Sequence, residues 1–288
     1  MDRLETRELE YFLAVAEELH FGRAAARLMI AQPALSRAIR QIEQRLGVRL
    51  LERSSRRVSL TAAGEILFDE GRRALDAVMA ATRHARQAGQ PDALLRLALK
   101  PGGDGGLLPD ILAAYEQQPD APAVEIVFGG AADRAALLRD GRADVAILHT
   151  PHENVHGLDT ETLMIEQRVA VLPSWHRLAR RASLRLDDLR GETLPRWHGV
   201  TADGATGPEV ADVLQLKQLV ALGRTIAVLT RSVVGPLRPD LVCVPVLDAA
   251  TSTLVVAWPQ ATRARHVAAF VRAATTVAAT SDRWTDSG

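Results

Sequence analysis

Two stretches decide the N-terminal fold: residues 21–39 read FGRAAARLMIAQPALSRAI, and residues 46–64 read LGVRLLERSSRRVSLTAAG. In the first, an alanine-rich segment is followed by Ile30, Ala31 and Gln32, and then by Pro33, which suits the first turn of a helix. Beyond it, residues recur at helical spacing on an apolar and a polar face: Leu35, Ile39, Ile42 and Leu46 against Ser36, Arg37, Arg40 and Gln44. Two short helices with a tight turn between them predict a helix-turn-helix.

The second stretch predicts a wing and then a long helix. Strand-like segments at residues 48–51 and 57–60 flank a tip at residues 53–56. A helix is expected from Thr61, a suitable N-cap, to residue 88, with an apolar stripe of Ile66, Leu67, Leu75, Val78 and Met79. Because a module of about 60 residues cannot cover so long a helix, we expect it to pair with its copy in a second subunit.

Basic residues are concentrated in the same region, although the whole chain has no net charge. Between His20 and Leu60, nine arginines and no lysine oppose only Glu43 and Glu52, so the stretch carries +7 and the remainder −7. Arginine suits forked hydrogen bonding to phosphate and to guanine edges. The pattern favours a nucleic-acid partner, although a solvated basic face has the same composition.

From residue 94 the pattern changes to alternating strands and helices. Strands are expected at residues 94–100, 124–128, 144–149, 167–172, 225–229, 241–246 and 254–258, and helices at 107–117, 133–140, 212–222 and 263–279. Such alternation predicts parallel sheets with helices on both faces. Residues 89–92, Gly-Gln-Pro-Asp, look like the linker that precedes this α/β region.

Composition argues against several other classes of protein. The apolar runs are far shorter than the roughly 20 residues that span a bilayer. The N-terminus has no apolar signal core, and the single cysteine, Cys243, cannot form an internal disulfide, so a cytoplasmic location is expected. No serine elbow, phosphate-binding loop or paired carboxylates indicate an enzyme or a cofactor. His149, His152 and His156 lack the pattern of a zinc site, so no metal is expected.

The two N-terminal stretches, with Glu43 between them, resemble the signature of LysR-type transcriptional regulators over the first 65 residues. Residues 107–109, 141–147 and 219–223 resemble the effector domain of that family more loosely. The resemblance implies a winged helix-turn-helix that binds a palindromic double-stranded DNA operator as a homodimer or homotetramer. It also implies an α/β effector domain of two Rossmann-like subdomains, similar to periplasmic binding proteins, through which a small molecule controls DNA binding, with no membrane contact.

We therefore expect three parts in the chain: the winged helix-turn-helix at residues 1–60, a linker and dimerisation helix at 61–90, and the effector-binding domain at 91–288. Within the last, subdomain I is expected at residues 91–160 and 262–280, and subdomain II at 161–261.

Seven residues are expected to face DNA, on the recognition helix and the wing: Gln32, Pro33, Ser36, Arg37, Arg40, Arg53 and Arg56. Arg37 can donate two hydrogen bonds to guanine, Gln32 can pair with adenine, and Ser36 can bind phosphate. One departure from the family lies next to them, because Ala31 stands where the family commonly has serine. If this residue caps the helix, the loss costs about 1 kcal/mol.

The effector is expected between the two subdomains, at the carboxyl ends of strands. The candidate residues are Lys100, Pro101, Gly102, Gly103, Gly129, Gly130, His149, Thr150, Trp197 and His198. Lys100 and the glycine-rich loop before a helix N-terminus suit an anion. Two alternatives stay open, since the same loop is typical of a flexible turn and a tryptophan is equally typical of a core.

A second departure from the family is the short segment between His198 and Asp212, which has 13 residues. Related regulators usually carry a further helix and strand there, so we expect a smaller or more open pocket and a compact ligand. Two other functions stay open: a small-molecule-binding protein without a regulatory role, and an enzyme that uses the α/β cleft. The missing signal core and the basic stretch argue against the first, and the missing catalytic residues argue against the second.

Overall fold

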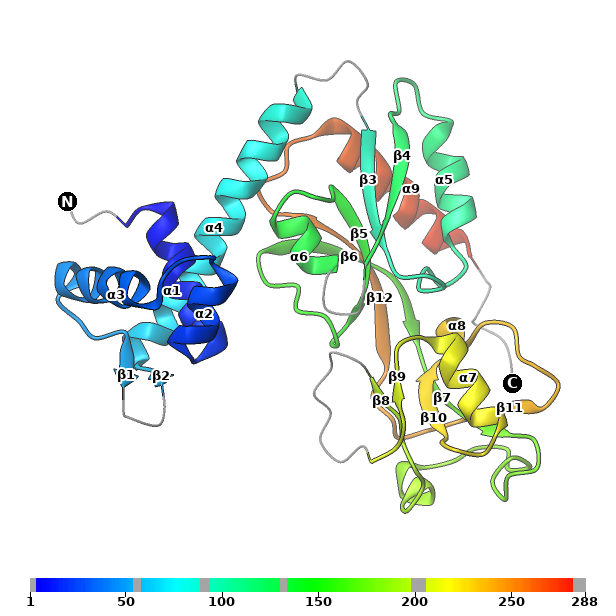
Figure 1. Ribbon diagram of the computed structural model, residues 1–288. Helices are drawn as coiled ribbons and strands as arrows, with labels where there is room; N and C mark the ends of the chain where they lie inside the picture. The colour runs from blue at the N-terminus through cyan, green and yellow to red at the C-terminus, as the bar shows by residue number, and fades with distance from the viewer. Residues whose placement is uncertain (1–3, 54–57, 89–93, 130–133, 198–205, 282–288) are drawn as a thin grey trace. The chain divides into compact units, whose positions relative to one another are not determined.

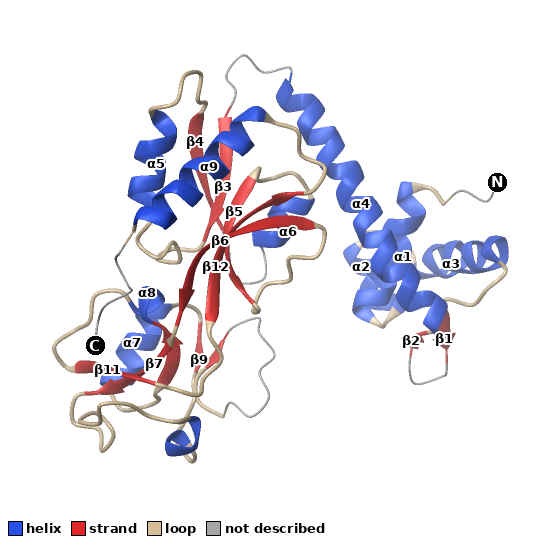
Figure 2. Cartoon of the chain, turned by 180° about the vertical axis from the view of Figure 1, so that it is seen from behind, coloured by secondary structure: helices blue, strands red, loops and turns tan. Residues whose placement is uncertain are grey.

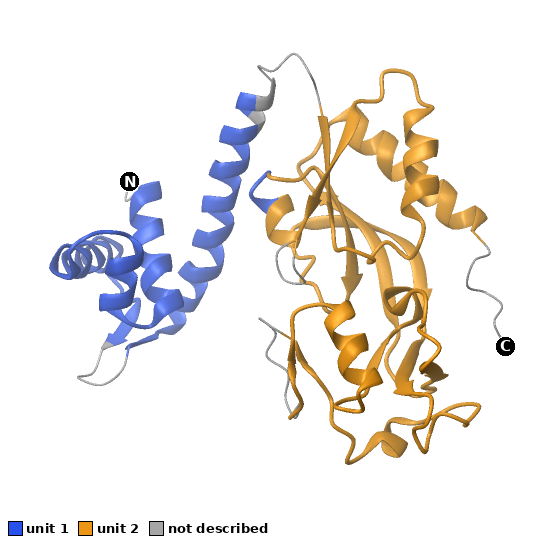
Figure 3. Ribbon diagram, turned by 45° about the vertical axis from the view of Figure 1, so that its right-hand side comes forward, with its two compact units in different colours: residues 1–87, 139–141 blue, residues 88–138, 142–288 orange. Residues whose placement is uncertain are grey.

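A computed structural model gives the structure of the chain and describes residues 4–53, 58–88, 94–129, 134–197 and 206–281 (Figure 1). The chain divides into two compact units: residues 1–87 with 139–141, and residues 88–138 with 142–288 (Figure 3). Among the described residues, no helix is both long and apolar enough to cross a membrane.

The first unit is a winged helix-turn-helix followed by a long helix, as the sequence predicts. Its elements are α1 (Thr6–Glu18), α2 (Phe21–Arg27), α3 (Gln32–Leu46), the antiparallel strands β1 (Leu51–Arg53) and β2 (Val58–Leu60), and α4 (Ala62–Ala88). The apolar stripe of α3 packs into a core with α1, in which Phe12, Val15, Leu35, Ile39 and Ile42 are fully buried.

Local chemistry fixes the way in which the chain leaves α3. Gly47 ends the helix in the left-handed conformation, with φ 69°, which a residue with a side chain adopts only at a cost. A carboxylate oxygen of Glu43 then accepts hydrogen bonds from the backbone amides of Leu50 and Leu51, at 3.0 and 3.2 Å. These bonds hold the first strand of the wing against α3.

The start of α4 is fixed by Thr61, whose hydroxyl accepts a hydrogen bond from the Gly64 amide at 3.0 Å, as expected for an N-cap. Leu67, Phe68 and Leu75 of α4 pack against the helix-turn-helix core. The module therefore covers two residues of the predicted stripe, Leu67 and Leu75, so the expectation that it cannot cover the helix was wrong for them. Farther along the helix, Val78 and Met79 are 47% and 38% exposed.

The second unit contains a five-stranded mixed sheet with the order β4-β3-β5-β12-β6. The strands are β3 (Leu94–Leu99), β4 (Ala123–Phe128), β5 (Val145–Thr150), β6 (Leu158–Glu166) and β12 (Ser252–Pro259). β3 is parallel to β4 and β5, whereas β12 is antiparallel to β5 and β6.

Two features of this sheet differ from the sequence prediction. β6 was not expected as a strand, because its central residues are exposed and give no continuous apolar run. Both β6 and β12 lie in this sheet, whereas the sequence analysis assigned residues 161–261, which include most of β6 and all of β12, to subdomain II. The run from Leu254 to Ala257 is buried on both faces, which suits an interior strand of the larger sheet.

Helices cover both faces of this sheet. α5 (Leu108–Glu116) and α9 (Arg265–Thr280) pack together on one face, where the rings of Tyr115 and Phe270 meet edge to face at 5.4 Å (Figure 2). α6 (Arg134–Arg139) packs on the other face, against Ala98, Ala146 and Leu148. Helices therefore cover both faces of the sheet that contains β3, β4 and β5.

A second, three-stranded sheet has the order β10-β7-β11, and both outer strands are antiparallel to β7. Its part of the unit comprises β7 (Arg168–Pro173), β10 (Ala227–Thr230), β11 (Leu241–Pro245), α7 (Val213–Ala221), α8 (Arg231–Val234), a 3-10 helix (Leu186–Leu189) and the parallel pair β8 (Arg196–Trp197) and β9 (Glu209–Val210). The prediction of parallel strands was wrong for this sheet. Alternation along the chain did not fix strand direction, because β7 follows β6 directly after Gln167 with no helix between them.

Candidate nucleic-acid interface and ligand site

The exposed face of α3 carries the predicted DNA-facing residues. Gln32, Pro33, Arg37 and Arg40 are exposed and Ser36 is half-buried, while the opposite face of the helix lies in the core. The Arg40 Nε donates a hydrogen bond to the Ser36 carbonyl oxygen at 3.2 Å. Arg37 has no hydrogen bond or ion pair with the described part of the chain, so its guanidinium can bind an external acceptor.

The two wing residues predicted to face DNA lie partly or wholly outside the described part of the chain. The backbone of Arg53 ends β1, but its side chain lies outside the described atoms, and Arg56 lies outside the described residues. Ala31 is the N-cap of α3, and its backbone carbonyl accepts from the Leu35 amide at 3.2 Å without any side-chain cap. The position of the suspected missing cap is therefore confirmed.

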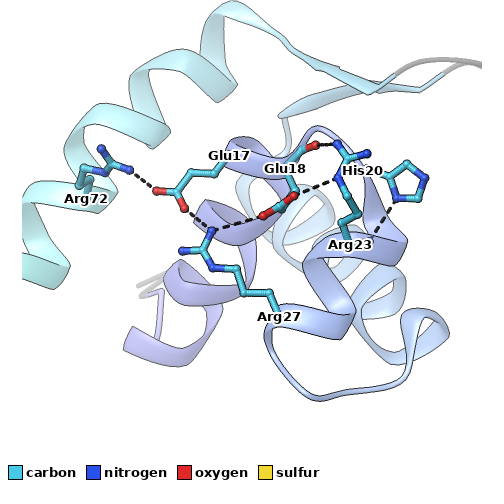
Figure 4. A network of polar contacts seen from close by, with 6 residues as sticks. All are labelled: Glu17, Glu18, His20, Arg23, Arg27 and Arg72. Atoms are coloured by element: carbon cyan, nitrogen blue, oxygen red, sulfur yellow. Dashed lines mark hydrogen bonds and ion pairs between the residues drawn. The ribbon is translucent and has the colours of Figure 1, made fainter. Parts of the chain in front are cut away.

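Several arginines of the basic stretch hold the module together (Figure 4). Arg23 pairs with Glu18 at 3.0 Å, and Arg27 pairs with Glu17 at 2.6 Å. Glu17 also binds Arg72 of α4, so one carboxylate joins α1, α2 and α4.

The ion pairs of this network offset part of the positive charge that the sequence shows between His20 and Leu60. Burial alone would raise the pKa of Glu17, but the hydrogen bonds and charges of Arg27 and Arg72 hold the pKa below its usual value. Because Arg23 and Arg27 are neutralised locally, the basic surface of the module is narrower than the sequence suggests. It centres on α3 and the segment after it, where Arg37, Arg40 and Arg49 are exposed.

The candidate ligand site begins at Lys100, which follows β3. Its Nζ lies 5.4 Å from the centroid of the Trp197 ring on β8. Trp197 is half-buried and packs against the core of the second sheet, so it is both a core residue and a neighbour of Lys100.

The glycine-rich loop after Lys100 is a hydrogen-bonded turn. The Gly103 amide donates to the Lys100 carbonyl at 2.9 Å, and Gly102 has a φ of 67°; Pro101 and Gly102 are exposed. The Leu108 amide at the start of α5 donates to the Asp104 carboxylate at 3.3 Å. This amide is therefore already occupied by an acidic group of the chain, which argues against an anion site at the α5 N-terminus.

The other strand ends converge beside a residue that the sequence analysis did not select, Arg134 at the start of α6. Gly129 lies so close to the Arg134 side chain that an added Cβ would be 3.1 Å from Cγ. His149 is buried at the end of β5, and the Thr150 hydroxyl donates to the Thr253 carbonyl at 3.4 Å. Gly130 and His198 lie outside the described residues.

Arg134 forms a buried ion pair with Glu153, in which the two side chains are 2% and 4% exposed. Oε1 of Glu153 accepts from both Arg134 Nη2 and the His149 backbone amide, the latter at 3.0 Å. Four buried side-chain atoms here have no hydrogen-bond partner among the described residues: Arg134 Nε and Nη1, His149 Nε2 and Glu153 Oε2. The only sequence signal was a charged residue opening the short apolar run Arg-Ala-Ala-Leu-Leu at residues 134–138.

The site is electropositive. Burial, followed by the charges of Arg134, Lys100 and His152, lowers the pKa of His149 to about 4, so its ring is neutral at pH 7. Burial also lowers the pKa of Lys100, and Arg134 lowers it further, while Glu153 opposes this change. Burial raises the pKa of Glu153, although the charge of Arg134 acts to lower it. Lys100 and Arg134 outnumber the one carboxylate, Glu153, and Arg168 contacts the neighbouring His152, so basic side chains are in excess here.

The winged helix-turn-helix and the α/β unit together define a class of protein: bacterial DNA-binding regulators with a substrate-binding domain. A family model described as "Bacterial regulatory helix-turn-helix protein, lysR family" matches residues 6–65, and "LysR substrate binding domain" matches residues 88–279. The chain belongs to the LysR family.

Relatives and solved structures support this assignment. The chain is 30% identical over 282 residues to the transcriptional regulator TtuA of Agrobacterium vitis, with 90% of this chain and 93% of TtuA covered. It is 36% identical over 192 residues to the regulator AlsR of Bacillus subtilis (strain 168), with 66% of this chain and 63% of AlsR covered, less than two thirds of that relative. A crystal structure of full-length BenM aligns with a TM-score of 0.56 at 25% identity, covering 96% of this chain and 97% of that one.

Proposed function

We propose that this chain is a LysR-type transcriptional regulator that binds a palindromic operator as a homodimer or homotetramer and responds to a small anionic effector. The observation that carries the proposal is the exposed polar face of α3, where Arg37 projects with no partner in the described part of the chain. The same proposal includes the cytoplasmic location that the sequence analysis expected from the single cysteine, Cys243, and from the lack of an apolar signal core.

Each DNA contact has a separate chemical role. Arg37 can read guanine with two hydrogen bonds, and Gln32 can pair with adenine, in the major groove. Ser36 and Arg40, on the same face, suit phosphate, which fixes the register of the helix on the duplex without reading its sequence. The wing arginines Arg53 and Arg56 are proposed to bind the DNA backbone beside the recognition helix.

Two copies of the module are needed to read both halves of a palindrome. Val78 and Met79 continue the apolar face of α4 beyond the part covered by the helix-turn-helix core. We place the contact between two protomers on this part of α4.

The proposed effector binds at the strand ends that carry Lys100, Gly129 and His149, facing Trp197. An anion there is attracted by the net positive charge of the site. Because Lys100 and Trp197 belong to different subdomains, a ligand between them changes how the subdomains meet, and this change is proposed to alter DNA binding.

The test is selection of bound sequences from random double-stranded DNA by the full-length chain, followed by fluorescence anisotropy on the selected site. We expect a palindromic sequence bound at least about a thousandfold more tightly than random DNA of equal length. Affinity should also fall steeply with salt, because phosphate contacts release counterions. Equal affinity for selected and random DNA would overturn the proposal.

A further inference from the structure

We infer that Arg134 is the carboxylate-binding residue of the ligand site and that the effector class is small organic monocarboxylates. This inference rests on the proposed function only in calling the ligand an effector, since the binding chemistry itself comes from the buried side chains. Neither the sequence motifs nor the strand-end positions pointed to Arg134.

The unpaired nitrogens of Arg134 carry the argument. Its side chain is 2% exposed, yet among the described residues only its Nη2 has a partner, the Glu153 carboxylate. Nε and Nη1 are buried without an acceptor in the described part of the chain. A buried guanidinium donor left unpaired is costly, and a carboxylate oxygen satisfies such a donor through a charge-assisted hydrogen bond.

Neighbouring groups favour a singly charged ligand. Arg134 is paired with Glu153 in a buried ion pair, and Lys100 is a further basic side chain close enough to interact electrostatically with both. One carboxylate therefore balances the charge of this group. A dianion such as sulfate would bring a second negative charge that these side chains leave uncompensated, which is unfavourable in a buried place.

Trp197 favours an organic ligand over an inorganic ion. Its ring lies beside Lys100 Nζ, and we place the part of the ligand that follows the carboxylate against this flat apolar surface. Gly129 leaves space for the Arg134 side chain, because a Cβ at this position would press against Arg134 Cγ.

The experiment measures thermal unfolding of the full-length chain with sodium benzoate and sodium acetate as probes, against sodium chloride and sodium sulfate at equal ionic strength. A monocarboxylate at ten times its dissociation constant should raise the melting temperature by about 3 °C or more, and the two inorganic salts should not. If neither carboxylate raised it above the chloride value at 100 mM, the inference would be overturned.

Two variants locate the effect at Arg134. Arg134→Met combined with Glu153→Gln removes both charges and keeps an acceptor for the His149 amide, and we expect it to abolish the carboxylate shift. Glu153→Gln alone leaves the guanidinium without its counter-charge, so the midpoint of the carboxylate titration should fall about tenfold. The second variant decides the question if the first does not fold.

The matched control is Arg96→Met with Glu125→Gln, which removes a partly exposed ion pair between β3 and β4 of the same sheet. Its carboxylate response should equal that of the unmodified chain. A normal response in the Arg134 double variant, or no tightening in Glu153→Gln, overturns the inference. DNA binding by the unmodified chain is measured separately, so that failure of the regulatory function is distinguishable from failure of the carboxylate site.

Discussion

The Nζ of Lys100 lies 5.4 Å from the centroid of the Trp197 ring, and this contact joins the end of β3 in the five-stranded sheet to β8 beside the second sheet. A cation over an aromatic ring contributes about 0.5–2 kcal/mol, more when the pair is shielded from water. The contact therefore links two parts of the α/β unit beside the strand ends that form the candidate ligand site.

Lys100→Met should remove the effect of a bound carboxylate on DNA binding. The substitution keeps much of the apolar stem but removes the positive charge and the contact with Trp197. The measurement is fluorescence anisotropy on the selected operator, with and without the carboxylate that raises the melting temperature most. Lys217→Met is the matched control, because Lys217 is the only other lysine of the sequence and its Nζ binds the Pro236 carbonyl instead. A normal response in Lys100→Met would show that the lysine does not take part.

Arg37→Ala should cost about 1–3 kcal/mol of binding free energy on the selected operator and relax the preference at one base position. Its guanidinium projects from the exposed face of α3, where a guanine edge can accept two hydrogen bonds. The measurement compares affinities for the operator and for operators substituted at single positions. Equal loss on operator and random DNA would make Arg37 a phosphate contact.

Val78→Asp combined with Met79→Asp should convert dimers into monomers that bind the operator weakly. Both residues are exposed on α4 and continue the face that carries Leu75. Leu75→Asp should act differently and lower the free energy of unfolding, because Leu75 packs against the core of its own module. Light scattering measures the mass of each variant. If Ile66→Asp separated the protomers and the double variant did not, the interface would lie on the other face of α4.

Ala31→Ser should raise the free energy of unfolding by about 0.5–1 kcal/mol, since a serine oxygen at an N-cap accepts an amide hydrogen bond that alanine leaves unmade. Ala31 already has the extended backbone of an N-cap, with φ −71° and ψ 134°. Urea unfolding measures the change, and Ala31→Gly serves as the control for backbone freedom. A less stable serine variant would contradict the expected geometry.

Stability should fall when the pH is lowered from 6.5 to 4, because burial lowers the pKa of His149 from 6.5 to about 4. In this range the unfolded chain binds a proton at His149 that the folded chain does not, so protonation favours unfolding. The contribution of His149 is complete above pH 6.5 and is lost as the pH falls to 4, with a magnitude of up to about 3 kcal/mol. His149→Gln should flatten this part of the pH profile in urea unfolding. An unchanged profile in His149→Gln would contradict this prediction.

Much of the first unit could be predicted from the sequence. The apolar spacing of Leu35, Ile39 and Ile42, the helix start at Pro33 and the cap at Thr61 are local patterns, and local patterns predict local structure. Strand ends were predicted for the same reason, which is why Lys100, Gly129 and His149 were selected before the sheet order was known.

Only the tertiary structure decided which charges are free and which are paired. Arg23 and Arg27 count toward a basic stretch in the sequence, but Glu17 and Glu18 neutralise them once α1 and α2 pack together. Packing between distant segments also decided three other features. It placed β12 in the five-stranded sheet, covered Leu75 with the helix-turn-helix core, and paired Arg134 with Glu153, 19 residues away. Periodicity reports which side of an element is buried, whereas a contact between elements exists only after the chain has folded.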